Sequence, residues 1–492
     1  MLFNSLQFAI FFPIVTLLYF ALPHRQRGTM LLLASCLFYM AFVPAYIVIL
    51  FVTILIDYVA GIRIEASTGA RRRVWLVVSI VSTCAVLFVF KYFDFFNESA
   101  AVAARAMGME YAIPALRLLL PVGLSFHTFQ SLSYVVEVHA GRQRAERDFG
   151  LYALYVMFYP QLVAGPIERP QNLLHQFREE HRFDYDRVVA GLQLMAWGLV
   201  KKVVVADRLA DLANRVYDSP RQFTGVPLWL GTIAFAFQIY CDFSGYSDIA
   251  IGSAQVMGFT LMKNFDRPYI ARSVSEFWRR WHISLSTWFR DYLYVPLGGN
   301  RVARPRWLAN LFITFLVSGL WHGARWTFVV WGALHGAYLI ASLLTTDSRT
   351  RIHAALGLDR YPRLVAAWQI GVTFTLVTVA WVFFRATSIA DAWYVLSHLG
   401  TGLPQQLGAL ASGDRAAHDA FLFLGFEPSR LIIAAAAVVA LLALERARGG
   451  SPLRVRFAHW PVAARWSAYA CAVLTIMTLG VFGSAKFIYF QF

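Results

Sequence analysis

Long apolar runs recur along the whole chain and alternate with short polar segments. Runs of about 17–25 residues can cross a hydrocarbon core about 30 Å thick, and several here are shorter or interrupted by Pro and Gly. The pattern predicts an all-α polytopic membrane protein with about eleven to thirteen transmembrane or re-entrant helices. The candidate spans are residues 6–22, 30–43, 45–62, 73–93, 115–138, 149–164, 187–206, 226–242, 246–262, 308–322, 326–345, 364–386, 430–444 and 465–484.

Composition supports the same class. Of 492 residues, 58% are hydrophobic and 15% are charged, whereas soluble domains contain about 25% charged residues. The first apolar run lacks the positive n-region and cleavage site of a signal peptide, so we expect an uncleaved first span. With no soluble domain or repeat visible, residues 1–492 are expected to form a single integral-membrane domain that contacts the lipid bilayer.

The net charge of +16 comes from basic residues in short segments between the spans. Cytoplasmic loops of membrane proteins collect Lys and Arg, and no nucleic-acid-binding motif is present, so we expect no nucleic-acid partner. The more acidic segments 94–111 and 388–429 are expected outside. The last span then delivers the C-terminus to the outer side. The basic segments, which are expected in the cytoplasm, are residues 24–27, 63–73, 142–147, 349–363 and 446–465.

No pattern of metal ligands or bound cofactors is present. The four cysteines are scattered without a C-x-x-C pair, and H-x-x-x-H, Walker and G-x-S-x-G patterns do not occur. We therefore expect no metal and no bound cofactor.

The segment 274–301, VSEFWRRWHISLSTWFRDYLYVPLGGNR, combines regularly spaced aromatic residues with arginines. One interpretation is an interfacial amphipathic helix. The other is that Arg279, Arg280 and Arg290 bind the phosphates of an anionic molecule such as coenzyme A.

Upstream, QIYCDFSGYSDIA at 238–250 is too polar for a lipid-facing helix. Its polar groups must face another helix, through hydrogen bonds, or form the wall of a polar tunnel.

His322 lies in the apolar stretch LVSGLWHGARW. Ionisable groups inside membranes are rare and usually functional, and burial keeps an imidazole neutral, as a general base requires. The small residues Ser318, Gly319, Gly323 and Ala324 are expected to leave room for a thin substrate. His282 is a second candidate imidazole, whereas His127 and His335 are expected to be core or interface residues. Acyl transfer suits such a base, because it requires no metal or redox cofactor.

Several long motifs together resemble one family. They are LPVGLSFHTFQSLSYVVEV, FYPQLVAGPIERP, FQIYCDFSGYSDIAIG, NFDRPYIARSVSEFWRRWHISLSTWFRDYLYVPLGGNR and NLFITFLVSGLWHGARWTFVVWGALHG. They are similar to the membrane-bound O-acyltransferases, in the subgroup of bacterial alginate O-acetylation proteins and their relatives in D-alanine transfer to teichoic acids. The most diagnostic core is 120–345, followed by C-terminal helices and an aromatic tail in 364–492. One departure is His127, where an aromatic residue is expected.

The resemblance implies a helical ring around a central tunnel, with His322 and His282 as the catalytic histidines. It implies acetyl-CoA as the acyl donor and Tyr489, in the tail FGSAKFIYFQF, as a candidate acyl relay. Tyr489 could instead be an aromatic interfacial anchor. The expected setting is a bacterial inner membrane, with an extracytoplasmic SGNH-type acetyltransferase and polysaccharide synthesis machinery as partners.

The function implied is acetyl transfer across the membrane for O-acetylation of an extracellular polysaccharide such as alginate. Within the same family, D-alanyl transfer or peptidoglycan O-acetylation is the alternative. A transporter or channel is the alternative from another class, although no internal repeat supports it. The sequence does not identify the polysaccharide, the partner or the oligomeric state.

Overall fold

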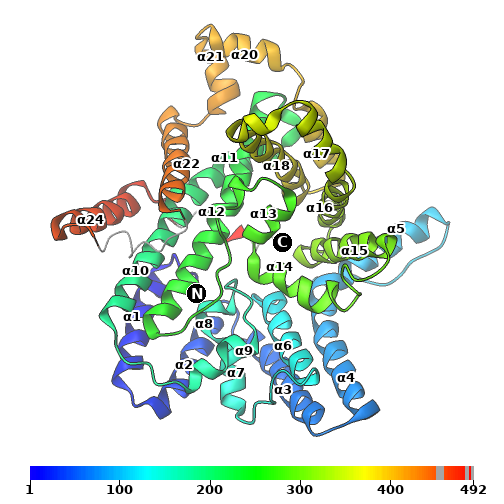
Figure 1. Cartoon of the computed structure of the whole chain (residues 1–492), viewed down its shortest axis with the longest axis vertical. Coiled ribbons are helices and arrows are strands. Elements are labelled where there is room, and N and C mark those ends of the chain that lie inside the picture. Colours follow the sequence, from blue (N-terminus) through cyan, green and yellow to red (C-terminus); the bar gives the residue numbers. More distant parts are fainter. Residues whose placement is uncertain (450–458, 483–486, 489–492) are drawn as a thin grey trace. The chain divides into compact units, whose positions relative to one another are not determined.

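The computed structural model describes residues 1–449, 459–482 and 487–488, and every regular element among them is a helix (Figure 1). Contacts divide the chain into two compact units. Unit 1 comprises Met1–Met195 and Tyr246–Lys263, and unit 2 comprises Ala196–Gly245 and Asn264–Phe492. Each unit is described separately below.

Unit 1 contains the N-terminal helices. They are α1 (Leu6–Ala21), α2 (His24–Met40), α3 (Tyr46–Glu65), α4 (Gly69–Leu87), the π-helix η1 (Phe88–Tyr92), α5 (Phe93–Ala106), α6 (Leu124–His139), α7 (Phe149–Met157), α8 (Tyr159–Leu162), α9 (Pro170–Leu173), η2 (His175–Arg178) and most of α10 (Tyr185–Leu199).

Unit 2 contains most of the remaining helices. They are the π-helix η3 (Val200–Ala206), α11 (Asp207–Tyr217), η4 (Pro220–Gln222), α12 (Val226–Met257), which continues into unit 1, η5 (Pro268–Ile270), α13 (Val274–Arg280), α14 (Ile283–Phe289), η6 (Arg290–Tyr294), α15 (Arg304–His322), α16 (Trp326–Leu344), α17 (Thr346–Ala355), η7 (Leu358–Arg360), α18 (Pro362–Arg385), α19 (Ile389–His398), α20 (Leu403–Ala411), α21 (Arg415–Ala417), η8 (His418–Phe423), α22 (Pro428–Arg448) and α24 (Val462–Leu479).

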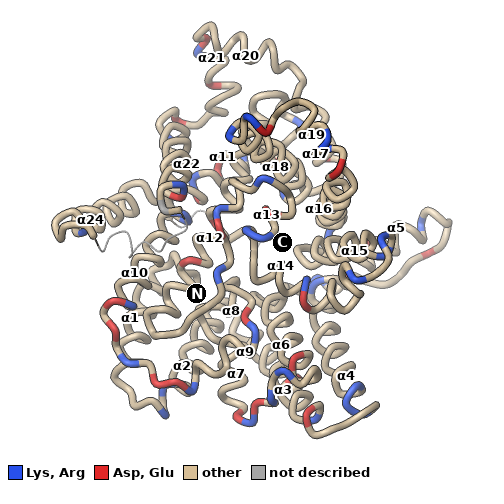
Figure 2. The backbone as a smooth tube through the Cα atoms, in the orientation of Figure 1, with Lys and Arg blue, Asp and Glu red and all other residues tan. Residues whose placement is uncertain are grey.

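The prediction of an all-α polytopic membrane protein is confirmed. Among the described residues, eight helical runs are long and apolar enough to cross a membrane. The apolar helix α1 is shorter, at 16 residues. Charged residues lie mostly at helix ends and in connecting segments (Figure 2). The central tunnel stays a prediction. The eight runs are Tyr46–Glu65, Gly69–Ala106, Tyr185–Tyr217, Val226–Met257, Trp326–Leu344, Pro362–Arg385, Pro428–Ala447 and Val462–Leu479.

Three of the span predictions are wrong in detail. The spans expected at 226–242 and 246–262 form one continuous helix, α12, of 32 residues. Gly245 does not interrupt it, because a helix tolerates a single glycine. A Cβ at Gly245 would lie 2.7 Å from the carbonyl oxygen of Gly198, so this glycine allows close packing. The span expected at 115–138 becomes helical only at Leu124.

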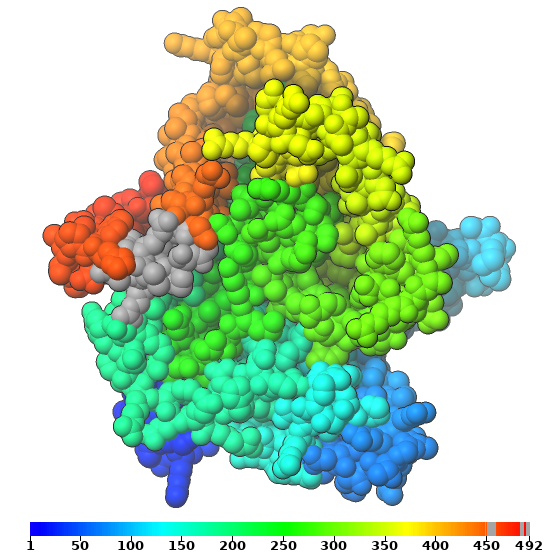
Figure 3. All heavy atoms as spheres, in the orientation of Figure 1, coloured from blue at the N-terminus to red at the C-terminus, as the bar shows by residue number. Residues whose placement is uncertain are grey.

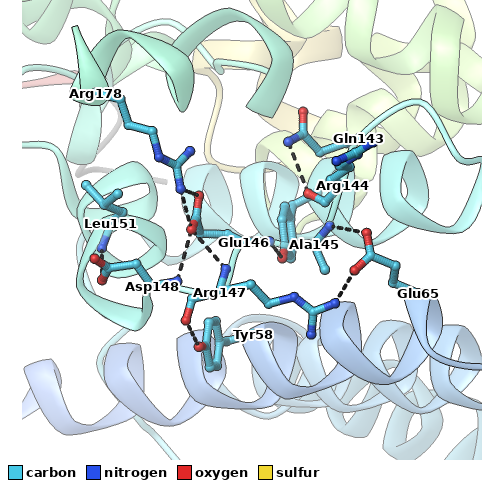
Figure 4. Close-up of polar contacts among 11 residues, drawn as sticks. Tyr58, Glu65, Gln143, Arg144, Ala145, Glu146, Arg147, Asp148, Leu151 and Arg178 are labelled. Atoms are coloured by element: carbon cyan, nitrogen blue, oxygen red, sulfur yellow. Dashed lines mark hydrogen bonds and ion pairs between the residues drawn. The ribbon is translucent and has the colours of Figure 1, made fainter.

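A polar network fixes the segment between α6 and α7 in unit 1 (Figure 4). The Arg178 guanidinium donates to both carboxylate oxygens of Glu146, at 2.6 and 2.7 Å. Arg147 pairs with Glu65 on α3, and Asp148 caps α7 by accepting from the Leu151 N–H. The basic segment 142–147 is therefore tied to neighbouring helices by ion pairs.

Close packing of α15 against α16 builds part of the core of unit 2. A Cβ at Gly319 would lie 2.3 Å from the Phe328 carbonyl oxygen and 3.0 Å from the Cα of Gly332. These helices can approach this closely only because both positions are glycine. The packing fixes the C-terminal end of α15, where His322 lies, against α16.

Candidate active site

The 274–301 segment is not one amphipathic helix, and that interpretation is wrong. Helix α13 ends at Arg280, α14 begins at Ile283, and His282 between them has φ +43° and ψ +54°. A non-glycine residue in the left-handed region costs on the order of 1–3 kcal/mol, and it persists only where the surroundings fix it. The break turns the His282 side chain into the interior, where the residue is fully buried.

Asn264 fixes both the backbone and the ring of His282. Its side-chain oxygen accepts from the Ser284 backbone N–H and hydroxyl, at 3.3 and 3.0 Å. The same oxygen lies 3.1 Å from Nδ1 of His282. Because a carbonyl oxygen can only accept, Nδ1 carries the proton and Nε2 carries the lone pair. The sequence analysis did not single out Asn264 as a site residue, although it is the first residue of the motif NFDRPYIARSVSEFWRR and lies in a loop.

His282 is neutral near physiological pH. It lies outside the candidate spans, and burial lowers its pKa to about 3. Desolvation disfavours the imidazolium form. A neutral ring with a lone pair on Nε2 can accept a hydrogen bond or a proton.

His322 ends α15 and is 3% exposed. Aromatic rings surround it, with Trp331 at a centroid distance of 4.9 Å and Phe384 at 5.3 Å. Its ring centroid lies 6.5 Å from that of His282. The structure thus brings together the two histidines that the sequence singles out. His335 lies beyond Trp331, and its Nδ1 accepts from the indole N–H of Trp278 at 3.2 Å.

The small residues next to His322 do not leave the open space that we expected. A Cβ at Gly323 would lie 2.2 Å from the Phe328 ring, and Gly319 is in contact with α16. Both glycines serve close helix packing. Ser318 differs, because it lines a cavity.

That cavity has a volume of about 320 Å³ and lies beside α13, α14, η6 and α15. Arg279 and Arg290 line it together with Trp278 and Phe289, and Ser318 lies one helical turn before His322. In the space-filling view, the green atoms of residues 274–294 adjoin the yellow-green atoms of α15 (Figure 3). An apolar wall with two guanidinium groups suits a molecule that has an apolar chain and an anionic end.

The other two predicted site positions are placed differently. Arg280 does not line this cavity, and its guanidinium pairs with Glu276 at 2.8 Å and with Asp266 at 3.7 Å. Arg290 does line it, and its guanidinium pairs with Asp291 at 2.7 Å. Tyr489 lies outside the described residues. The two tail residues before it, Phe487 and Ile488, are each 1% exposed.

A buried ionic cluster in unit 2 joins η3, α11 and α12. Lys202 Nζ lies 2.7 Å from Asp207 Oδ1 and 2.8 Å from Asp242 Oδ1. Nearby, Lys201 donates to the Ser244 hydroxyl at 3.0 Å. Interhelical hydrogen bonding, one of the two interpretations of the 238–250 segment, therefore applies to Asp242 and Ser244. Sequence reasoning missed the lysines, although two lysines inside an apolar span are a usable signal.

Comparison with known proteins connects this geometry to a family. The family model described as "MBOAT, membrane-bound O-acyltransferase family" matches residues 148–386, which include His282 and His322. The chain is 41% identical to the probable alginate O-acetylase AlgI of Pseudomonas aeruginosa, over 80% of this chain and 74% of that protein. The chain belongs to the membrane-bound O-acyltransferase family. It is therefore a multi-pass membrane enzyme that transfers acyl groups to oxygen.

Other relatives show the range of this O-acyltransferase family. The peptidoglycan O-acetyltransferase of Helicobacter pylori is 34% identical, over 80% of this chain and 79% of that protein. The teichoic acid D-alanyltransferase of Streptococcus thermophilus is 27% identical, over 56% of this chain and 70% of that protein. Membership of an enzyme family leaves the transporter alternative without support.

Proposed function

We propose that this O-acyltransferase takes acetyl groups from cytoplasmic acetyl-CoA and passes them across a bacterial inner membrane for O-acetylation of an extracellular polysaccharide such as alginate. The observation that carries the proposal is the buried pair His282 and His322. A cavity lined by Arg279 and Arg290 includes Ile283, the residue after His282, although neither histidine lines it. The 41% identity to an alginate O-acetylase, against 27% to a D-alanyltransferase, favours acetyl over D-alanyl.

In the proposed reaction, neutral His322 takes the proton of the Tyr489 hydroxyl, and His282 orients or assists it. The phenolic oxygen attacks the thioester carbonyl, the C–S bond breaks, and the coenzyme A thiolate leaves and takes the proton from His322. The products are an acetyl ester on Tyr489 and free coenzyme A. General-base catalysis of this kind contributes typically about 10²–10⁴-fold.

The cavity suits the donor, because coenzyme A combines an extended pantetheine arm with phosphates. Arg279 and Arg290 would hold the phosphates through charge-assisted hydrogen bonds, and the apolar wall would pack against the arm. Acetyl-CoA is a substrate in this scheme and not a resident cofactor.

The C-terminal tail would receive the acetyl group and present it outside the cytoplasm. Phe487 lies 6.1 Å from the Phe243 ring, and Phe243 lies 4.6 Å from His282, measured between ring centroids. The Phe243 ring is therefore close both to Phe487 of the tail and to His282 of the histidine pair. An extracytoplasmic SGNH-type acetyltransferase would then take the acetyl group from Tyr489 and pass it to the product of the polysaccharide synthesis machinery.

The test offers the purified protein labelled acetyl-CoA and, separately, a D-alanyl thioester of a carrier protein. We expect covalent label on the protein with acetyl-CoA and none with the carrier thioester. Label with the carrier thioester and none with acetyl-CoA would overturn the acetyl assignment and favour D-alanyl transfer. In cells, loss of polysaccharide acetylation with unchanged peptidoglycan acetylation in a deletion strain would separate the two acetyl acceptors.

A further inference from the structure

Three backbone groups near the C-terminal end of unit 2, in Leu479, Val481 and Ile488, form hydrogen bonds with other parts of the unit. The Leu479 carbonyl oxygen accepts from the Arg208 guanidinium at 2.7 Å, and the Val481 N–H donates to the Val203 carbonyl oxygen at 2.9 Å. The Ile488 N–H donates to Asp242 Oδ2 at 2.8 Å. The hydrogen bond of Ile488 is made to the buried carboxylate of Asp242 and lies next to the histidine site.

Asp242 divides its two oxygens between two partners. Oδ1 lies 2.8 Å from Lys202 Nζ, and Oδ2 accepts the Ile488 N–H. Lys202 in turn pairs with Asp207, and all three side chains are at most 6% exposed. Burying a carboxylate costs free energy unless it is hydrogen-bonded, and the tail supplies one of these hydrogen bonds.

The local backbone is built to place this cluster. Lys201 and Lys202 lie on the π-helix η3, an element that is rare and is often found at functional sites. Gly245 on α12 lets η3 approach closely, since a Cβ there would lie 3.2 Å from the Lys202 backbone nitrogen. The lysine can thus reach across to Asp242, one turn earlier on α12.

Adjacent residues of α12 hold adjacent residues of the tail. Asp242 binds the backbone of Ile488, and the Phe243 ring lies 6.1 Å from that of Phe487 and 4.6 Å from that of His282. Tyr489 follows Ile488 directly in the sequence.

We infer that Asp242, held by Lys202, is a positioning residue that docks the C-terminal tail beside the histidine pair. The inference deepens the proposed function and rests on it for the role of Tyr489, but the docking itself needs no acyl group. Asp242 acts through the tail backbone and contacts no reacting atom in this scheme.

The experiment compares Asp242→Leu with Asp207→Leu in the full-length purified protein. Both substitutions remove one carboxylate partner of Lys202, at 2.8 and 2.7 Å, whereas the hydrogen bond from Ile488 goes to Asp242. Tail docking is measured without substrate, as the rate at which a carboxypeptidase trims the chain past Ile488, followed by intact mass spectrometry. Acyl transfer from labelled acetyl-CoA is measured in parallel, with kcat and KM separated.

We expect trimming of Asp242→Leu to be about tenfold faster or more, because a charge-assisted hydrogen bond is lost. Asp207→Leu should stay close to the unsubstituted protein. In Asp242→Leu, kcat should also fall, whereas the KM for acetyl-CoA should stay unchanged. Asp242→Asn, which keeps an oxygen acceptor, should restore much of both properties.

Equal trimming rates in the unsubstituted protein and Asp242→Leu would overturn the docking, as would equal acceleration in both leucine variants. Faster trimming with unchanged kcat would overturn the positioning role. A failure of the proposed function has a different signature: Tyr489→Phe would then transfer acetyl groups normally, while the dependence of trimming on Asp242 persisted.

Discussion

Substitution of Gly319 by alanine should displace His322 relative to the other residues of the site. The added Cβ would lie 2.3 Å from the backbone oxygen of Phe328, about 1 Å closer than ordinary van der Waals contact. A backbone atom cannot rotate away, so α15 and α16 must separate. Overpacking of this kind costs about 1–3 kcal/mol of unfolding free energy.

The separation should also reduce activity. His322 ends α15, and its neighbour Trp331 lies on α16, with ring centroids 4.9 Å apart. A displacement of about 1 Å at a reacting group can lower the rate by about 100-fold. The assays are thermal unfolding in detergent and acetyl transfer from labelled acetyl-CoA at saturating donor.

Gly371→Ala on α18 is the matched control. It makes the same chemical change in a helix, and a Cβ there has no heavy atom within 4 Å. We expect it to leave the activity unchanged and the unfolding temperature equal or slightly higher, because alanine is the better helix former by about 1 kcal/mol. If Gly319→Ala behaved like Gly371→Ala in both assays, the reasoning from helix packing would be refuted.

Three further predictions concern the site itself. Asn264→Ala should lower kcat by about 10–100-fold with little change in the donor KM, because the His282 ring loses the oxygen that orients it. A kcat equal to that of the unsubstituted protein would contradict this role of Asn264. Arg279→Gln and Arg290→Gln should each raise the KM for acetyl-CoA by about tenfold or more, whereas Arg280→Gln should leave KM unchanged, and equal effects of all three would argue against the cavity as the donor site. Tyr489→Phe should abolish acetylation of the polysaccharide while the protein still folds, and normal acetylation would show that this tyrosine is only an interfacial anchor.

Helical periodicity and apolar run length were sufficient to predict the fold class, because lipid forces the backbone of each span to satisfy its own hydrogen bonds. They were not sufficient to predict where helices break or continue. The break at His282 depends on Asn264, a partner 18 residues earlier. Helix α12 continues through Gly245, where the glycine allows close packing against Gly198.

The candidate site was predictable in part. His322 stands out because an ionisable group within an apolar stretch is costly, and the structure places it beside His282. The link between Lys202 and Asp242 joins residues 40 positions apart, and no local pattern encodes such a pairing. The same applies to Arg280, because only the folded chain shows that Arg279 and Arg290 line the cavity and that Arg280 does not.

The role of His322 as the base is tested most directly by covalent labelling of the purified protein with labelled acetyl-CoA, in the unsubstituted form and as His322→Ala. We predict acetyl label on Tyr489 in the unsubstituted protein, located by peptide mass spectrometry, and a loss of at least about 100-fold in the labelling rate for His322→Ala. Undiminished labelling of His322→Ala, with the same unfolding temperature as the unsubstituted protein, would show that His322 is not the base.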